Sequence, residues 1–182
     1  MKYAGKLSTV RAFFLITVTL SVAITGCKQQ GEPDAAAQAP LPAGLLLTRE
    51  PPGARPVEDV KKGAKVGDAV TIRGVVGGSK DPFVEGRAMF TLMGFGLKPC
   101  GAGSPMPDCA TPWDYCCDLP GDIAAHSATV QFVDANEKPL RVSLKGKGGI
   151  KELSELIVVG KVKLVEGKLL IVNATGVYVA KS

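Results

Sequence analysis

Apolar and polar residues alternate along several short runs of this chain, which is the pattern of half-buried β-strands. Residues 69–76 (AVTIRGVV) form the first run, and Gly74 within it predicts a bulge or a sharp bend. Residues 88–93 (AMFTLM) and 128–133 (ATVQFV) repeat the period of two. These three runs predict strands that turn one face toward a core.

Turn-forming residues separate the remaining runs and predict two hairpins. The sequence DANEKP leads from the third strand into residues 140–144 (LRVSL), where the alternation resumes. The second hairpin joins residues 156–164 and 169–173 through the turn VEGK, and residues 175–180 extend it. Residues 149–155 (GIKELSE), between the hairpins, predict one short helix.

This order of elements resembles the OB-fold, a five-stranded Greek-key barrel, over about residues 66–179. The motifs that carry the resemblance are VTIRGVV (70–76), VVGKV (158–162) and NATGV (173–177). Small exported bacterial OB-fold proteins are the most similar group, while an SH3-like barrel or a small sandwich would give similar spacing. The expected fold is all-β: a small five-stranded OB-fold-like barrel over residues 61–182, with one short helix and a Cys-rich insertion at 98–126.

The N-terminus has the layout of an export signal. Basic residues precede an apolar run at residues 12–24 (AFFLITVTLSVAI), which as a helix would span roughly 20 Å and is short for a membrane core of about 30 Å. A transmembrane helix is the alternative interpretation. The pattern predicts that residues 1–26 are a signal peptide that is removed.

Residues 24–27 (ITGC) resemble the lipobox of bacterial lipoprotein precursors. The resemblance implies a diacylglycerol on the sulfur of Cys27, cleavage after Gly26 and, in many bacteria, acylation such as palmitate on the new amino terminus. Two or three acyl chains anchor a protein durably where one would be marginal. We therefore expect a lipoprotein of the bacterial cell envelope that faces the periplasm or the exterior, on either membrane.

A lipidated, mostly unfolded tether is expected at residues 27–60, because prolines oppose regular structure and apolar area is small. The exception is the cluster Leu45–Leu47 (LLL at 45–47), for which docking on the domain as a short edge strand is an alternative. The net charge falls from +5 to about +2 when the signal peptide is removed. That small charge makes nucleic acid an unlikely partner.

Four cysteines lie in the Cys-rich insertion, at Cys100, Cys109, Cys116 and Cys117. Outside the cytoplasm, two disulfides are the expected arrangement, and they would stabilise a Gly- and Pro-rich loop. A link between the adjacent cysteines would be strained, so links from Cys100 and Cys109 to this pair are favoured. The sequence alone leaves the pairing open.

The alternative for these cysteines is a thiolate metal site or a redox-active pair. Four sulfurs complete a tetrahedral zinc shell, but the spacing lacks a CxxC knuckle, and adjacent side chains diverge in an extended chain. An oxidising compartment also opposes free thiols. His126 is a weak further ligand candidate, at the end of a single helical turn for which Asp122 is the expected N-cap.

Trp113, Asp114 and Tyr115 stand beside the cysteines and form a possible contact patch for a sugar, a peptide or a partner protein, or else a cover for disulfides. The chain has no triad, paired-carboxylate or phosphate-loop signature, so no catalytic residue is predicted. The expected function is a non-catalytic binding or assembly module at the envelope, with an unidentified protein or small ligand as its partner. The alternative is a periplasmic metal-handling or thiol-redox protein that uses the four cysteines.

Overall fold

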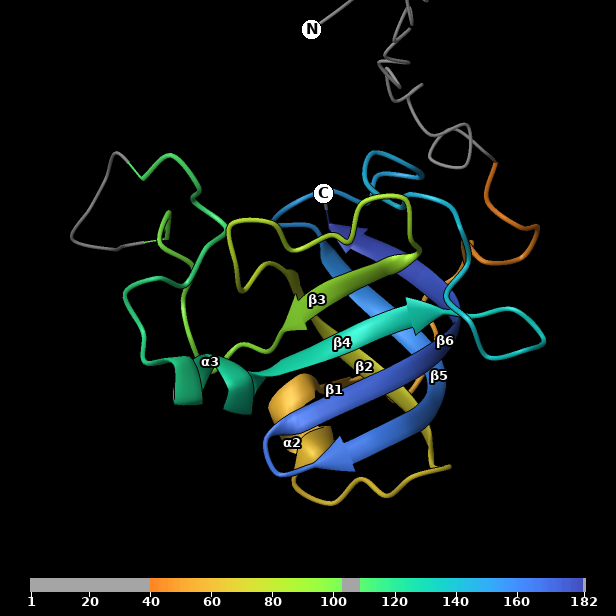
Figure 1. Cartoon of the computed structure of the whole chain (residues 1–182), viewed down its shortest axis with the longest axis horizontal. Coiled ribbons are helices and arrows are strands. Elements are labelled where there is room, and N and C mark those ends of the chain that lie inside the picture. Colours follow the sequence, from red (N-terminus) through yellow and green to blue (C-terminus); the bar gives the residue numbers. More distant parts are fainter. Residues whose placement is uncertain (1–39, 103–108, 182) are drawn as a thin grey trace, which may run out of the picture. The chain divides into compact units, whose positions relative to one another are not determined.

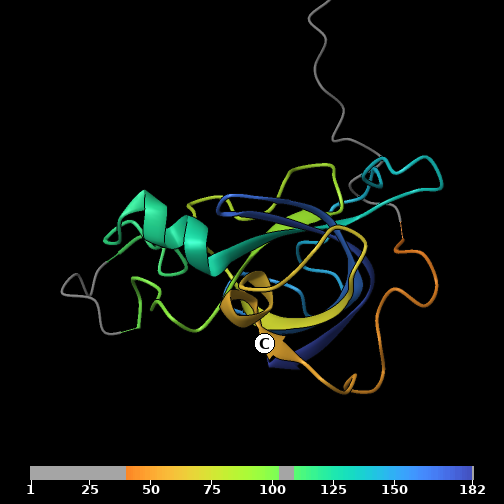
Figure 2. The same cartoon turned by 90° about the horizontal axis from the view of Figure 1, so that it is seen from below.

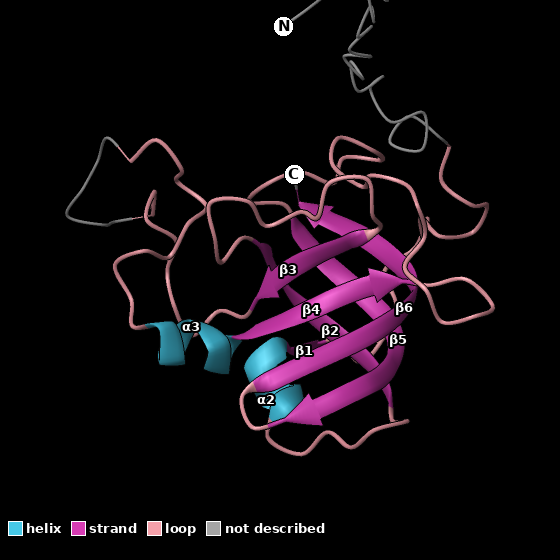
Figure 3. Ribbon diagram, viewed as in Figure 1, coloured by secondary structure: helices cyan, strands magenta, loops and turns pink. Residues whose placement is uncertain are grey.

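The computed structural model of the chain describes residues 40–102 and 109–181 (Figure 1). The predicted signal peptide, Cys27 and the first part of the predicted tether lie outside these residues, as do residues 103–108 of the Cys-rich insertion. One sheet contains the strands β1 (Arg55–Pro56), β2 (Ala69–Val76), β3 (Met89–Met93), β4 (Ser127–Phe132), β5 (Glu155–Glu166) and β6 (Leu169–Lys181). Two short helices, α2 (Val57–Lys61) and α3 (Pro120–His126), accompany it, so the described fold is all-β (Figure 3).

The five longer strands pair in a closed cycle: β2 with β3, β3 with β4, β4 with β6, β6 with β5, and β5 with β2. Only the β4–β6 pair is parallel, and the other four are antiparallel. The two-residue strand β1 adds to β2 in parallel, with Arg55 opposite Ile72. Figure 2 shows the strands curving around a common interior, with α2 at one end of it.

The core fills this interior with side chains from every long strand. It includes the fully buried residues Ile72, Phe90, Val130, Leu156 and Val172. Helix α2 also contributes, because Val57 and Val60 belong to the same cluster. This helix has only five residues, too few to be stable alone, so its packing on the core must hold it.

Five of the predicted strands are confirmed. The first matches β2 residue for residue, and the second and third agree with β3 and β4 to within one residue at each end. The predicted second hairpin is the pair β5–β6, in which residues 175–180 continue β6 without a break. Alternation of apolar and polar residues, rich in β-branched side chains, was therefore sufficient to predict a strand wherever a partner strand had a free edge.

The strand predicted at residues 140–144 is wrong. Its turn forms, with the Asp134 N–H donating to the Lys138 carbonyl at 2.8 Å and a bridge between Val133 and Pro139. The Leu140 N–H still donates to the Phe132 carbonyl at 2.8 Å. Further along, β4 already pairs with β3 on one side and β6 on the other, so the returning chain finds no free edge. The chain instead places Leu144, which is 1% exposed, in the core.

The helix predicted at residues 149–155 is also wrong, and a turn stands there. The Ser154 hydroxyl donates to the Gly149 carbonyl at 2.9 Å and accepts the Lys151 N–H at 3.1 Å. Leu153 has a φ of 63°, which is outside the helical region. A serine hydroxyl that bonds to nearby backbone groups competes with the hydrogen bonds of a helix. Here the bonds of Ser154 stabilise the turn.

Part of the segment predicted as a tether packs on the domain. Leu45 is 5% exposed and belongs to the core. The Leu47 N–H donates to the Val177 carbonyl, and the Val177 N–H donates to the Leu45 carbonyl, both at 2.8 Å. The docking considered for the Leu45–Leu47 cluster therefore occurs against β6. Among the described residues, no helix has the length and apolar character needed to span a membrane.

Candidate functional site

The Cys-rich insertion connects β3 to β4, and helix α2 holds both of its ends. Just before the insertion, the Phe95 N–H donates to Glu58 Oε1 at 3.1 Å. At its far end, the Lys61 ammonium donates to the carbonyls of Ala124, at 2.6 Å, and Ser127. Burial lowers the pKa of Lys61 to about 8. No sequence pattern pointed to these two side chains, because their role depends on the tertiary position of α2.

Two tight turns present the cysteines. Residues 99–102 form one turn, closed by a 2.9 Å hydrogen bond between its end residues, and Cys100 is its second residue. Residues 115–118 form another turn, also closed at 2.9 Å, with Cys116 and Cys117 in its two central positions. The adjacent cysteines therefore do not lie in an extended chain.

A short backbone ladder places the first turn beside the second. The Cys100 N–H donates to the Asp114 carbonyl at 2.8 Å, and the Gly101 N–H donates to the Pro112 carbonyl at 2.9 Å. A Cβ on Gly101 would stand 2.5 Å from the Pro112 Cβ, so glycine is required for this approach. The ladder fixes the position of Cys100 through its backbone alone.

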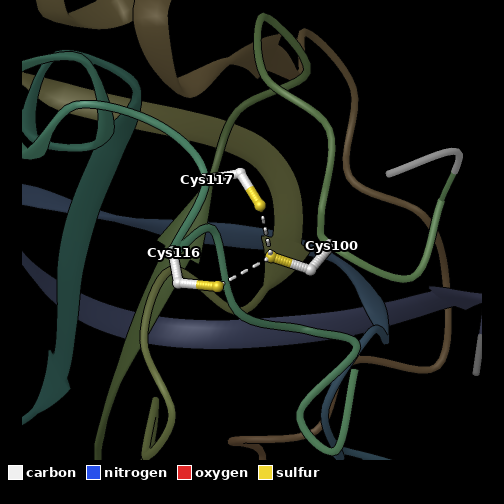
Figure 4. A group of neighbouring side chains, drawn as sticks. All are labelled: Cys100, Cys116 and Cys117. Carbon is white, nitrogen blue, oxygen red and sulfur yellow. Dashed lines mark hydrogen bonds between the residues drawn. The ribbon is translucent and has the colours of Figure 1, made fainter. Parts of the chain in front are cut away.

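Three sulfur atoms converge as a result (Figure 4). The Sγ of Cys100 lies 3.3 Å from that of Cys116 and 4.0 Å from that of Cys117, and all three lie within 4.8 Å of one another. Cys100 is 3% exposed, whereas Cys116 and Cys117 are exposed. The adjacent side chains were expected to diverge in an extended chain, but a turn presents them, and both sulfurs lie near that of Cys100. No disulfide joins the cysteines of the described residues, and the predicted pairing stays a prediction.

Cys109 stands outside this group of three. Its Sγ lies 3.5 Å from the carbonyl oxygen and 3.8 Å from the hydroxyl oxygen of Thr111. Hydrogen bonding to Thr111, first by its backbone and then by its hydroxyl, lowers the pKa of Cys109, and the Cys100 thiol adds a smaller effect in the same direction. Cys109 is therefore near the cluster but has its own local partner.

The neighbouring sulfurs change the pKa of Cys116. Hydrogen bonding with Cys100, followed by burial and the charge of Cys100, raises the pKa of Cys116 to about 12. The thiol of Cys116 is therefore protonated at neutral pH. A cation bound between the sulfurs would have to displace that proton.

The aromatic residues of the predicted contact patch fasten the insertion to the β2–β3 loop. The Trp113 indole N–H donates to the Lys80 carbonyl at 2.9 Å, and the Gly78 N–H donates to the Trp113 carbonyl at 3.2 Å. Tyr115 is 1% exposed, and burial raises its pKa to about 12. Asp114 accepts the Tyr115 N–H at 2.7 Å. The binding role of these three residues stays a prediction, while their contacts position the cysteine turns.

His126 lies apart from the sulfur group. Its Nδ1 is 2.9 Å from the carbonyl oxygen of Asp122. As expected from the sequence, α3 ends at His126, but it begins at Pro120 with Leu119 as the N-cap, so the N-cap role predicted for Asp122 is wrong. Proline at the first helical position needs no N–H partner, and it moves the helix start forward.

Comparisons of the chain with protein-family models, with curated proteins and with solved structures found no match. Among the described residues, the group of three sulfurs is the arrangement that is suited to holding a metal ion.

Proposed function

We propose that this protein is a lipid-anchored protein of the bacterial cell envelope that binds a thiophilic metal ion through Cys100, Cys116 and Cys117. The observation that carries the proposal is the convergence of these three sulfurs within 4.8 Å. Thiolate sulfur is a soft ligand that prefers copper, zinc and iron–sulfur centres to hard cations. No residue is assigned a catalytic role.

The spacing of the sulfurs supports a metal site. A metal–sulfur bond of about 2.3 Å places two ligands of a tetrahedral site roughly 3.8 Å apart. The distances of 3.3 Å and 4.0 Å from Cys100 fall on either side of that value. Small rotations of the two exposed side chains would equalise them, with no movement of the backbone ladder that holds Cys100.

The framework under the site is proposed to be an OB-fold-like five-stranded barrel. Its support is the closed cycle of pairings from β2 through β3, β4, β6 and β5 back to β2, together with the parallel β4–β6 pair. The Cys-rich insertion joins β3 to β4 on this framework. A rigid scaffold with a functional loop is a common way to position ligands precisely in space.

The anchoring proposal depends on the sequence alone, through the basic and apolar N-terminus and the ITGC motif at Cys27. In the envelope, thiols are exposed to oxidants, so a bound ion would protect the sulfurs from disulfide formation. Metal handling is preferred to a binding module built on Trp113 and Tyr115, because the Trp113 indole is bonded to the Lys80 carbonyl and Tyr115 is buried.

Metal binding by the reduced full-length protein in detergent tests this proposal. We expect one equivalent of zinc, cadmium or cuprous ion to remain bound after dialysis, and to be lost in Cys100→Ser. His126→Ala is the matched control, since this residue lies outside the sulfur group and should retain the metal. Failure of the wild-type protein to retain any of the three ions would overturn the proposal.

A non-catalytic binding module stapled by disulfides remains the second candidate. The 3.3 Å contact between Cys100 and Cys116 favours it, because closing a disulfide needs a sulfur separation of about 2.05 Å and only a small side-chain shift. Peptide mapping of the protein isolated without reductant distinguishes the two. A stoichiometric Cys100–Cys116 link that is inert to mild reductant supports the module and opposes metal handling.

A further inference from the structure

We infer that the ion held by this site is a single Cu(I) in a three-sulfur shell of Cys100, Cys116 and Cys117, with Cys109 outside the shell. This inference rests on the proposed function and names the cargo of the same site. Its first support is the ligand set, because the group within 4.8 Å contains three thiols and, among the described residues, no imidazole or carboxylate.

The number of ligands favours copper over zinc. Structural zinc sites are closed by four ligands, whereas Cys109 is not part of the group within 4.8 Å, and its Sγ lies 3.5 Å and 3.8 Å from two oxygens of Thr111. Three sulfurs around a central ion at about 2.3 Å would stand about 4.0 Å apart in a plane. The Cys100–Cys117 separation already has that value. Soft thiolate ligands suit both Cu(I) and zinc, and of these two ions Cu(I) is the one that three sulfurs alone can satisfy.

The exposure of the sulfurs indicates an ion that can be exchanged. Cys100 is 3% exposed and forms the floor of the site, while Cys116 and Cys117 are open to solvent. An incoming thiol can therefore replace one of the two exposed sulfurs without unfolding the insertion. The incoming thiol releases its proton, the departing cysteine sulfur takes one up, and copper remains Cu(I), so no oxidant is needed. The partner class implied by this chemistry is a molecule that presents thiols.

The surrounding contacts make the site ready for an ion before one binds. The hydrogen bonds from Cys100 to Asp114 and from Trp113 to Lys80 involve no sulfur, so they set the geometry independently of occupancy. Ligands fixed in advance lose little freedom when they bind, which strengthens binding.

Competition titrations of the full-length reduced protein in detergent test the inference. Cu(I) is supplied under anaerobic conditions against a chromophoric Cu(I) chelator, and the titration is repeated with Zn(II). We expect one Cu(I) per chain and an unchanged affinity in Cys109→Ser. Cys116→Ser and Cys117→Ser should each weaken binding by at least about 100-fold, more than the loss of an outer-shell partner would.

Two results would overturn the inference and leave the proposed function standing. One is an equal loss of affinity in Cys109→Ser, which would indicate a four-sulfur shell. The other is Zn(II) binding without Cu(I) binding. Absence of binding by both ions in protein with intact thiols would remove the proposed function as well. If excess glutathione does not remove copper from the folded protein, the claim that the two exposed sulfurs allow exchange is contradicted.

Discussion

The Sγ atoms of Cys100 and Cys116 lie 3.3 Å apart, although sixteen positions separate these residues in the sequence. The backbone hydrogen bonds of Cys100 with Asp114 and of Gly101 with Pro112 produce this proximity, and the anchoring of Trp113 on Lys80 supports it. Because none of these bonds includes a sulfur atom, the approach of the thiols is a property of the fold of the insertion.

Gly77 lies under the insertion, and a side chain there should displace it. A Cβ at this position would stand 2.6 Å from the Trp113 carbonyl oxygen and 3.2 Å from Cε2 of Tyr115. Gly77→Ala should lower the free energy of unfolding by about 1–3 kcal/mol and weaken metal binding. Gly63→Ala, which meets no atom within 4 Å, is the control and should cause no loss. Urea unfolding followed by circular dichroism measures the stability of both variants. Equal stabilities of Gly77→Ala and Gly63→Ala would contradict the close packing of Gly77 against Trp113 and Tyr115.

Trp113→Phe should loosen the insertion by removing one hydrogen bond. The indole N–H donates to the Lys80 carbonyl at 2.9 Å, and its loss should cost about 0.5–1.5 kcal/mol of unfolding free energy. Tyr178→Phe, on β6 and outside the Cys-rich insertion, is an aromatic control and should have a smaller effect. Thermal unfolding of the two variants compares their losses of stability. A larger loss in Tyr178→Phe than in Trp113→Phe would contradict the anchoring role of Trp113.

Lys61 should give the stability of the protein a distinctive dependence on pH. Burial lowers its pKa from 10.5 to about 8, so between these values the unfolded chain binds more protons than the folded one. The contribution of Lys61 to the free energy of unfolding should therefore rise with pH across this window. Lys61→Met should lose that rise, which urea unfolding at several pH values measures.

Lys62→Met is the control for this pH experiment. Lys62 is exposed and pairs with Asp59 at 2.7 Å, so its replacement should leave the rise in place. Identical pH profiles for the wild-type protein and Lys61→Met would show that the Lys61 ammonium is not desolvated in the folded state.

Leu45 tests how far the folded domain extends toward the N-terminus. This side chain is 5% exposed in the core, so Leu45→Ala should lower the free energy of unfolding by about 2–4 kcal/mol. Val66→Ala, at a residue that is 65% exposed, should change it by less than about 0.5 kcal/mol. Denaturant titration supplies both values. An unaffected Leu45→Ala would mean that this segment is part of the tether after all.

The sequence was sufficient to predict those strands that alternate in polarity and also have a neighbouring strand to pair with. β2 has the predicted bounds, and the β5–β6 hairpin follows its VEGK turn. The run at residues 140–144 has equally good alternation, yet β4 lacks a free edge for it. Whether a strand has a free edge depends on the topology of the whole sheet, so a local sequence pattern does not indicate it.

The two helices were harder to predict for a different reason. Helix α2 has five residues and is held by burial of Val57 and Val60, so local propensity contributes little. The sequence predicts a short helix at residues 149–155, but the Ser154 hydroxyl donates to the Gly149 carbonyl and favours a turn. Short helices depend on such tertiary and side-chain effects more than on sequence pattern.

For the candidate site, the sequence identified the four cysteines of the insertion but could not give the arrangement of the three that the structure brings together. The spacing of Cys100, Cys116 and Cys117 matches no common metal motif, because turns and a backbone ladder set the geometry in place of a short knuckle. The same composition fits disulfides or a metal, and only the placement of the three sulfurs distinguishes Cys109 from the others.

X-ray absorption at the metal edge of the loaded, reduced full-length protein reports the atoms that surround the bound ion. We expect a first shell of three sulfur atoms at about 2.3 Å, unchanged in Cys109→Ser and depleted in Cys116→Ser. A shell made of oxygen or nitrogen atoms would contradict a metal site at Cys100, Cys116 and Cys117.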